Sequence, residues 1–81
     1  MTIRPDYNAP GKLAYINKVL GYHNIPLTLH RDEGYHTFVF DDGAHLEERI
    51  KMIPYTSQQT LGRWVIDAEH AWNSIATRLA A

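Results

Sequence analysis

The spacing of apolar residues changes twice along this 81-residue chain, and this pattern constrains the fold more than any other feature. Between residues 13 and 22, apolar side chains recur every three or four positions, as they do on one face of an α-helix. Between residues 27 and 40 they alternate with polar side chains, which is typical of β-strands. From residue 61 to residue 79 the helical spacing returns. A helix, a group of strands and a second helix in this order predict an α+β fold.

The alternating segment predicts a β-hairpin. Residues 27–31 and 35–40 form its two strands, and Glu33-Gly34 supply a two-residue turn. In this register Leu29 lies opposite Phe38, so that the large apolar side chains share one face. That agreement between turn chemistry and apolar pattern supports the hairpin.

Residues 45–53, which follow a second turn at residues 41–44, fit two structures. They form either a third strand with Leu46, Ile50 and Met52 pointing inward, or a short helix that ends at Pro54. We favour the strand, because a two-stranded ribbon is marginally stable by itself and a third strand gives the helices a face to cover. The expected order is therefore helix, three-stranded antiparallel β-meander and C-terminal helix (αβββα).

The helix boundaries follow from proline, glycine and hydroxyl residues. Pro10 is expected in the first turn of the first helix, and Gly21 is expected to end that helix in the left-handed conformation. Ser57 or Thr60 is expected to cap the last helix. Trp64, Phe38 and Phe40 are expected in the core. The last helix carries the most regular apolar stripe of the chain, made of Leu61, Val65, Ala68, Trp72, Ile75 and Leu79.

Length and composition predict a single domain over residues 1–81 with an irregular N-terminal segment at residues 1–9. A chain of this size is too short for a second core. It contains no cysteine, so disulfides and thiolate metal sites are excluded. No apolar stretch has the length of a membrane span or the form of a secretory leader. We therefore expect a cytoplasmic protein with no membrane partner.

Charge is distributed unevenly although the formal net charge is only −1. Residues 32–48 contain six acidic residues and no lysine or arginine, and the rest of the chain carries eight basic and three acidic residues. Such a segment is suited to a basic protein surface, or is simply solvated without a partner. Nearby tyrosines either complete the core or add interface contacts. The candidate partner-binding residues are Asp32, Glu33, Tyr35, Asp41, Asp42, Glu47, Glu48 and Tyr55.

The histidines and carboxylates do not predict a metal site, a cofactor or a catalytic centre. His30 and His36 fall on opposite faces of the expected hairpin, so they cannot share an ion, and His45 lacks a recognised ligand spacing. Asp67 and His70 lie one helical turn apart without a nucleophile placed beside them, and we interpret them as a surface pair. No glycine-rich phosphate loop is present. An enzyme is not expected.

Two short motifs resemble those of small uncharacterised proteins from phages and other mobile elements. They are the hairpin segment Glu33-Gly34-Tyr35-His36-Thr37-Phe38 and the helix start Thr60-Leu61-Gly62-Arg63-Trp64-Val65. The acidic hairpin also looks like those found among anti-CRISPR proteins. The resemblance implies a non-enzymatic inhibitor that docks on a basic surface of a host protein or ribonucleoprotein complex that handles nucleic acid. If a phage encodes the chain, its compartment is the host cytoplasm.

The leading hypothesis is thus a protein-binding module that uses the acidic hairpin. One alternative is a small structural or oligomerisation protein. Separately, a homodimer through a sheet edge is a further partner expectation. The runner-up to the leading hypothesis is a nucleic-acid-associated accessory protein, although direct nucleic-acid binding is less expected at this net charge. The basic face in that case consists of Arg4, Lys12, Lys18, Arg49, Lys51 and Arg63.

Overall fold

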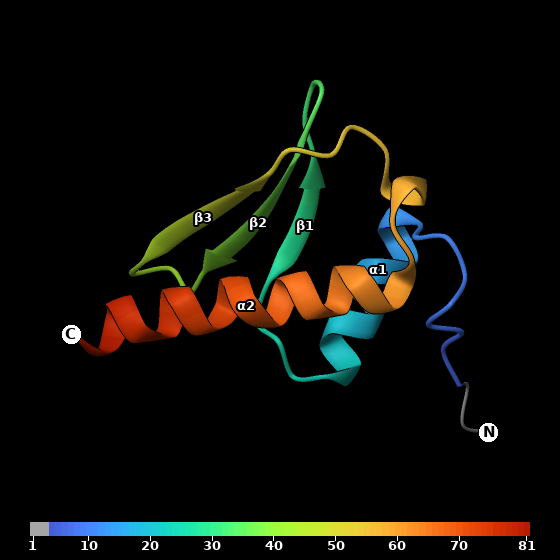
Figure 1. Cartoon of the computed structure of the whole chain (residues 1–81). Coiled ribbons are helices and arrows are strands. Elements are labelled where there is room, and N and C mark those ends of the chain that lie inside the picture. Colours follow the sequence, from blue (N-terminus) through green and yellow to red (C-terminus); the bar gives the residue numbers. More distant parts are fainter. Residues whose placement is uncertain (1–3) are drawn as a thin grey trace.

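The computed structural model describes residues 4–81 and confirms the order αβββα (Figure 1). Residues 4–9 form neither helix nor strand, as expected, and the rest of the predicted irregular segment, residues 1–3, lies outside the described residues. The elements are α1 (Leu13–Tyr22), β1 (Thr28–Arg31), β2 (His36–Asp41), β3 (Leu46–Lys51), the short 3-10 helix η1 (Thr56–Gln58) and α2 (Leu61–Ala80).

The three strands form an antiparallel sheet in the order β1-β2-β3, so the strand interpretation of residues 45–53 is confirmed. Leu29 pairs with Phe38 as predicted. The first turn is closed by a hydrogen bond from Asp32 N–H to the Tyr35 carbonyl, 2.9 Å, and Gly34 adopts a φ of +83° there. Only glycine takes that conformation without steric cost, so Gly34 sets the hairpin register.

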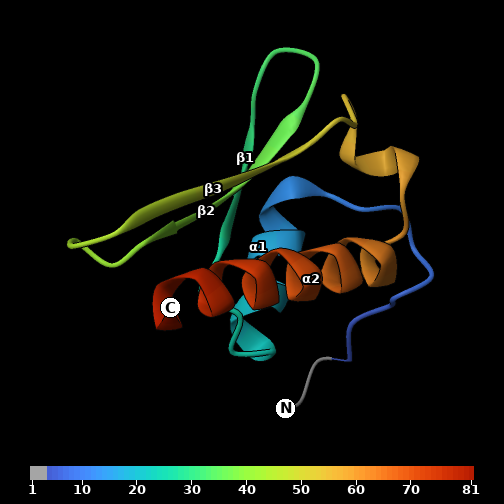
Figure 2. The same cartoon turned by 60° about the vertical axis from the view of Figure 1, so that its left-hand side comes forward.

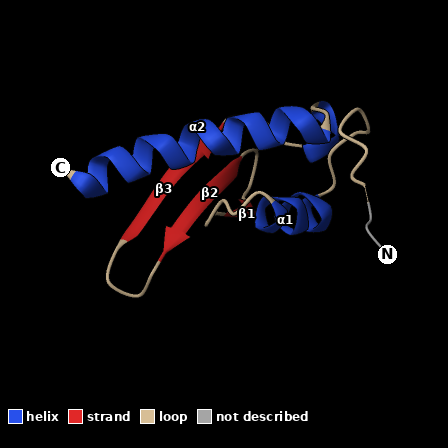
Figure 3. Ribbon diagram, turned by 90° about the horizontal axis from the view of Figure 1, so that it is seen from below, coloured by secondary structure: helices blue, strands red, loops and turns tan. Residues whose placement is uncertain are grey.

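The two helices occupy different positions around the sheet (Figures 1 and 3). Helix α2 crosses one face of the sheet, and α1 lies beside β1 and contacts both β1 and α2. The opposite face of β2 and β3 carries no helix in either view. The core therefore lies between one side of the sheet and the two helices.

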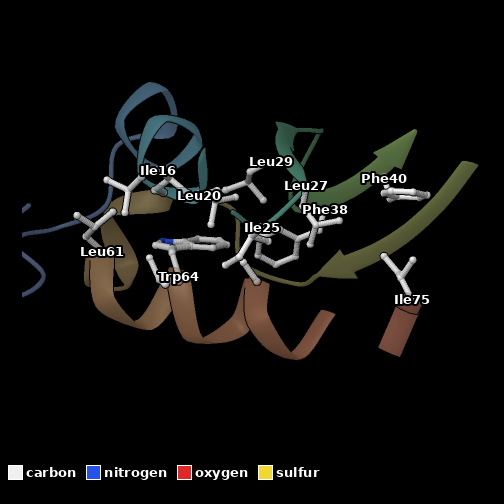
Figure 4. Close-up of a cluster of buried hydrophobic side chains, with 13 residues drawn as sticks. Ile16, Leu20, Ile25, Leu27, Leu29, Phe38, Phe40, Leu61, Trp64 and Ile75 are labelled. Atoms are coloured by element: carbon white, nitrogen blue, oxygen red, sulfur yellow. The ribbon is translucent and has the colours of Figure 1, made fainter. Parts of the chain in front are cut away.

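Trp64 of α2 occupies the centre of that core and is fully buried (Figure 4). Its ring meets Phe38 and His36 edge to face, with centroids 6.1 and 5.5 Å apart, and its Nε1–H donates to the Thr56 carbonyl at 2.8 Å. Buried indole N–H groups need such a partner. The expected core positions of Trp64, Phe38 and Phe40 are confirmed.

The expected start of the first helix at Pro10 is wrong. Residues 9–11 instead run extended beside the start of α2, where Pro10 bridges Thr60. Gly11 N–H donates to the Gln59 carbonyl and Leu61 N–H donates to the Ala9 carbonyl, both at 2.9 Å. These tertiary hydrogen bonds replace the helical ones that local propensity would allow, and α1 begins only after this segment.

Of the two remaining predictions for the helix boundaries, one is wrong and the other is confirmed. Gly21 does not end α1, which continues to Tyr22, and the left-handed residue is Asn24 with a φ of +55°. Asparagine tolerates this conformation better than most residues, so it turns the chain in place of glycine. Thr60 caps α2 as predicted, because its Oγ1 accepts the Arg63 N–H.

The expected orientation of β3 is also wrong. Leu46, Ile50 and Met52 do not point inward, and they are 60%, 62% and 76% exposed. The turn at Gly43-Ala44 places Leu46 opposite Asp41, and this pair sets the register of the rest of β3. The apolar positions of β3 therefore fall on the face that no helix covers.

Candidate binding surface

Strand β3 meets α2 through polar contacts instead of apolar ones. Its alternate residues Glu47, Arg49 and Lys51 share the helix-covered face with Phe38 and Phe40. The three contacts are Glu47 with Arg78 at 2.9 Å, Arg49 Nε with Ser74 Oγ at 3.3 Å and Lys51 with Asp67 at 3.0 Å. The charged residues of β3 therefore find their partners on α2, and the apolar residues of β3 point to the opposite face of the sheet.

Asp67 is the most enclosed of these carboxylates, with a side chain that is 9% exposed. The surface interpretation of Asp67 is therefore wrong, although His70 is exposed. Burial alone would raise the pKa of Asp67. Hydrogen bonds from Gln59 and Lys51 and the charges of Lys51 and Arg63 outweigh burial and hold the pKa below its usual value. Asp67 thus joins α2 to β3 and to the segment before α2.

We call the sheet face away from α2 the open face. By the strand register it carries the side chains of Thr28, His30, Thr37, Val39, Asp41, Leu46, Glu48 and Ile50. Thr37 is buried and Val39 is half-buried within it, while Leu46 and Ile50 are mostly exposed. The exposed apolar side chains of Leu46 and Ile50 thus lie on the edge strand β3, and the central strand β2 contributes Thr37 and Val39 beside them.

A groove of about 360 Å³ runs over the open face and the adjoining hairpin turn. Two of its lining residues are acidic, and none is lysine or arginine. Val39 and Ile50 line the groove together with the exposed carboxylates of Asp32 and Glu48, which make its rim negative. The lining residues are His30, Asp32, Tyr35, Thr37, Val39, Glu48 and Ile50.

The acidic residues predicted from the sequence do not form one patch. Asp32 and Glu33 lie in the β1–β2 turn, whereas Asp41 and Asp42 lie at the β2–β3 turn at the opposite end of the sheet (Figures 1 and 2). Glu47 faces α2. Of the eight candidates, the groove brings together Asp32, Tyr35 and Glu48.

Three of the aspartates have local roles in the turns. Asp32 accepts a hydrogen bond from the Thr37 hydroxyl at 2.7 Å, and Asp41 accepts the Gly43 N–H at 2.9 Å. The N–H groups of His45 and Ala44 donate to the Asp42 carboxylate and lower the pKa of Asp42. Asp41 and Asp42 therefore order the second turn, as short acidic side chains often do.

Tyr55 lies apart from the groove and is 58% exposed. The Arg31 guanidinium carbon lies 5.9 Å from the centroid of its ring. Both residues line a separate hollow of about 150 Å³ between the hairpin and η1, which also includes His36. The structure thus separates the two candidate tyrosines.

The histidines are distributed as the register predicted. His30 lies on the open face and bonds Thr28 Oγ1 at 2.8 Å, whereas His36 is buried on the other face. Nδ1 of His36 lies 2.7 Å from the Ile53 carbonyl oxygen. Because a carbonyl oxygen can only accept a hydrogen bond, Nδ1 carries the proton. The other ring nitrogen, Nε2, has no hydrogen-bond partner among the described residues. Within residues 4–81, no three His, Cys, Asp or Glu side chains are close enough together to hold a metal ion.

Several basic residues of the alternative basic face already contact acidic residues of the chain. Arg49 pairs with Glu47 at 3.6 Å, and Lys51 and Arg63 both reach Asp67, at 3.0 and 3.4 Å. These contacts reduce the positive charge that three of the six residues present to a nucleic acid.

The sequence interpretation missed the open face because it assigned the alternating residues of β3 to the wrong faces of the sheet. The signal was present: with Gly43-Ala44 as the turn and Phe40 inward, Glu47 must also point inward.

No protein-family model, curated protein or solved structure matches the chain. Over residues 4–81, none of the helices has both the length and the apolar character that a membrane span requires.

Proposed function

We propose that the chain is a non-enzymatic protein-binding module that docks through the open face. The observation that carries the proposal is the exposure of Leu46 and Ile50 on a sheet face that no helix covers. Exposed apolar groups gathered on one face and rimmed by polar residues are typical of interaction sites. Isolated exposed apolar residues would carry no such meaning.

The shape and charge of the face favour a macromolecular partner. The groove is a shallow depression along a sheet, whereas small-molecule sites enclose most of their ligand. Asp32 and Glu48 at its rim would speed encounter with a basic surface and disfavour acidic partners. Tyr35, half-buried at the edge of the groove, supplies the kind of rigid aromatic side chain that is enriched in interface hot spots.

The acidic rim also supports the narrower form of the proposal. In that form the chain is an inhibitor from a phage or another mobile element, and its partner is a host complex that handles nucleic acid. Such complexes present basic surfaces to their nucleic acids, and an acidic, apolar face would compete for them. The motif resemblance and this complementarity are its support.

Affinity capture with matched variants tests the proposal. The full chain, Ile50→Asp and Ile66→Asp serve as baits in a nuclease-treated lysate, because Ile66 is an exposed isoleucine of α2, 43% exposed and outside the open face. We expect the wild type and Ile66→Asp to retain the same protein in stoichiometric amounts and Ile50→Asp to lose it. Bound protein is quantified by mass spectrometry, and circular dichroism confirms that all baits are folded.

Two outcomes would contradict the proposal. If Ile50→Asp retains the partner with unchanged affinity, the open face is not the binding surface. If the wild type captures a partner only from a parallel lysate without nuclease, or if a Lys12→Glu, Lys18→Glu variant loses the partner, the basic-face alternative is favoured instead. Both lysines are exposed on or next to α1 and outside the groove.

A further inference from the structure

The two edges of the sheet differ in whether their outward backbone groups have hydrogen-bond partners. At the β1 edge, the Asn17 side chain of α1 donates from Nδ2 to the Leu29 carbonyl at 3.0 Å and accepts the Leu29 N–H on Oδ1 at 2.6 Å. A carboxamide offers the same donor and acceptor pair as the backbone of a neighbouring strand. Asn17 therefore takes the place of a further strand and closes this edge.

The β3 edge has no such cover within the described part of the chain. Asp42 N–H donates to the His45 carbonyl beside the second turn, and hydrogen-bonded pairs alternate from there along an antiparallel ladder. Glu47, Arg49 and Lys51 thus direct their backbone groups to β2, and the intervening residues 46, 48 and 50 direct theirs outward. Among residues 4–81, the one bond to these outward groups is from Arg49 Nη1 to the Glu48 carbonyl, 2.8 Å.

We propose that β3 pairs antiparallel with β3 of a second copy of the chain, about a two-fold axis at Glu48, to form a six-stranded sheet. The proposal is independent of the partner discussed above. In this register Leu46 lies opposite Ile50 of the second copy on the open face. Glu47 lies opposite Arg49 of the second copy on the helix side.

The sequence of β3 complements itself best in this register. It creates two apolar pairs and two pairs of opposite charge, which stabilise neighbouring strands, against the single like-charge pair of Glu48 with its copy. An axis at Ile50 would place Arg49 opposite Lys51 twice. An axis at Arg49 would place that arginine opposite itself and Glu48 opposite Ile50.

Neither helix lies along the outer edge of β3 in Figures 1 and 2, so this edge is open on the side away from β2. Helix α2 crosses the sheet on one face, and its C-terminal end reaches past β3 in Figure 3. A two-fold axis perpendicular to the sheet keeps both α2 helices on that face and brings the two open faces side by side. A strand edge buries less surface than a standard interface of about 1,600 Å², so we expect a weak, concentration-dependent dimer.

Sedimentation equilibrium of the full chain and two variants at Glu48 tests the pairing. Glu48→Gln removes the like-charge pair but keeps the outward N–H, and we expect it to dimerise roughly two- to fivefold more tightly. Glu48→Pro removes the same charge together with the N–H, and we expect it to stay monomeric at about 1 mM, because proline cannot donate to a new strand. The proposal is overturned if Glu48→Gln is monomeric at that concentration or if Glu48→Pro dimerises like the wild type.

Cysteine crosslinking tests the register and does not depend on the proline variant folding. The chain has no cysteine, so each introduced thiol is unique. Directly opposed residues in a hydrogen-bonded pair have Cα atoms about 5.5 Å apart, within the range for a disulfide. We expect Glu48→Cys to crosslink with itself, and Leu46→Cys mixed with Ile50→Cys to crosslink more than either alone. Equal rates for these combinations and for the α2 control Ile66→Cys would refute the register.

Discussion

At the scale of single residues, Gly11 shows how closely the N-terminal segment approaches the core. A Cβ atom on Gly11 would lie 2.6 Å from Trp64 Cδ1 and 2.8 Å from the Thr56 carbonyl oxygen, which also accepts the indole Nε1–H of Trp64. Both distances are shorter than packed atoms tolerate. Trp64 is buried on all sides and cannot move aside without disturbing Phe38 and His36.

Two glycine substitutions are expected to have opposite effects. Gly11→Ala should lower the free energy of unfolding by about 1–3 kcal/mol, because the added methyl overpacks the contact with Trp64. Gly21→Ala, in the last turn of α1 with open space around it, should raise stability by about 0.4–1 kcal/mol. Urea unfolding followed by circular dichroism measures both. A neutral Gly11→Ala would mean that residues 9–11 do not pack against Trp64.

At the scale of elements, Asp67 connects α2 to β3 and to the segment that precedes α2. It lies on α2, pairs with Lys51 of β3 and Arg63 of its own helix, and accepts a hydrogen bond from Gln59 at 3.0 Å. Hydrogen bonds to a charged, partly buried group contribute more than neutral ones. The charged side of β3 is thereby held against α2.

The lowered pKa of Asp67 makes this connection sensitive to acid. Because the folded-state pKa lies below the usual 3.8, the stabilisation is present above that value and is lost as the pH falls through the folded-state pKa. Asp67→Asn should cost about 1–3 kcal/mol at pH 7 and flatten the loss of stability below about pH 4.

Glu69→Gln is the matched control for that prediction. Glu69 is an exposed acid of the same helix, so its substitution should leave both the stability at pH 7 and its dependence on acid nearly unchanged. Denaturant melts from pH 2 to pH 7 provide the measurement. An Asp67→Asn profile parallel to that of wild type would show that this carboxylate does not carry the acid dependence.

At the scale of the whole molecule, the sheet separates a packed side from an unpacked one. The packed side holds the core residues of both helices and the sheet, and Figure 4 shows them gathered around Trp64 with Phe40 and Ile75 at the far end. The unpacked side is the open face. A residue's contribution to stability should therefore depend on which side it occupies more than on its type.

Two isoleucine substitutions compare the sides directly. Ile75→Ala, at a fully buried position of α2, should cost about 2–5 kcal/mol because it leaves a cavity. Ile50→Ala, at a position 62% exposed, should change the free energy of unfolding by no more than about 1 kcal/mol. Thermal and urea melts at low protein concentration measure both without a contribution from self-association. A large loss for Ile50→Ala would indicate that β3 has the opposite orientation.

Local patterns in the sequence were sufficient for the elements and their order. Apolar periodicity identified α2 and the hairpin, Gly34 determined the first turn, and Thr60 marked the start of α2, because each of these depends on nearby residues. They were not sufficient for the start of α1, which depends on hydrogen bonds between residues 9–11 and 59–61. The predicted acidic cluster depended on sequence proximity, which the two opposite turns do not preserve in space.

That a helix, a β-meander and a second helix form in this order follows from local signals, since turn chemistry and periodicity act over a few residues. The side of β3 that faces the core follows from the Gly43-Ala44 turn and the inward Phe40, but it is stable because side chains of α2, far along the chain, satisfy the charges of β3. Apolar burial alone favours Leu46 and Ile50 inward, but the register set by the β2–β3 turn points Glu47, Arg49 and Lys51 toward α2. There Arg78, Ser74 and Asp67 satisfy them, and partners that distant in the chain are supplied by the fold and not by local sequence.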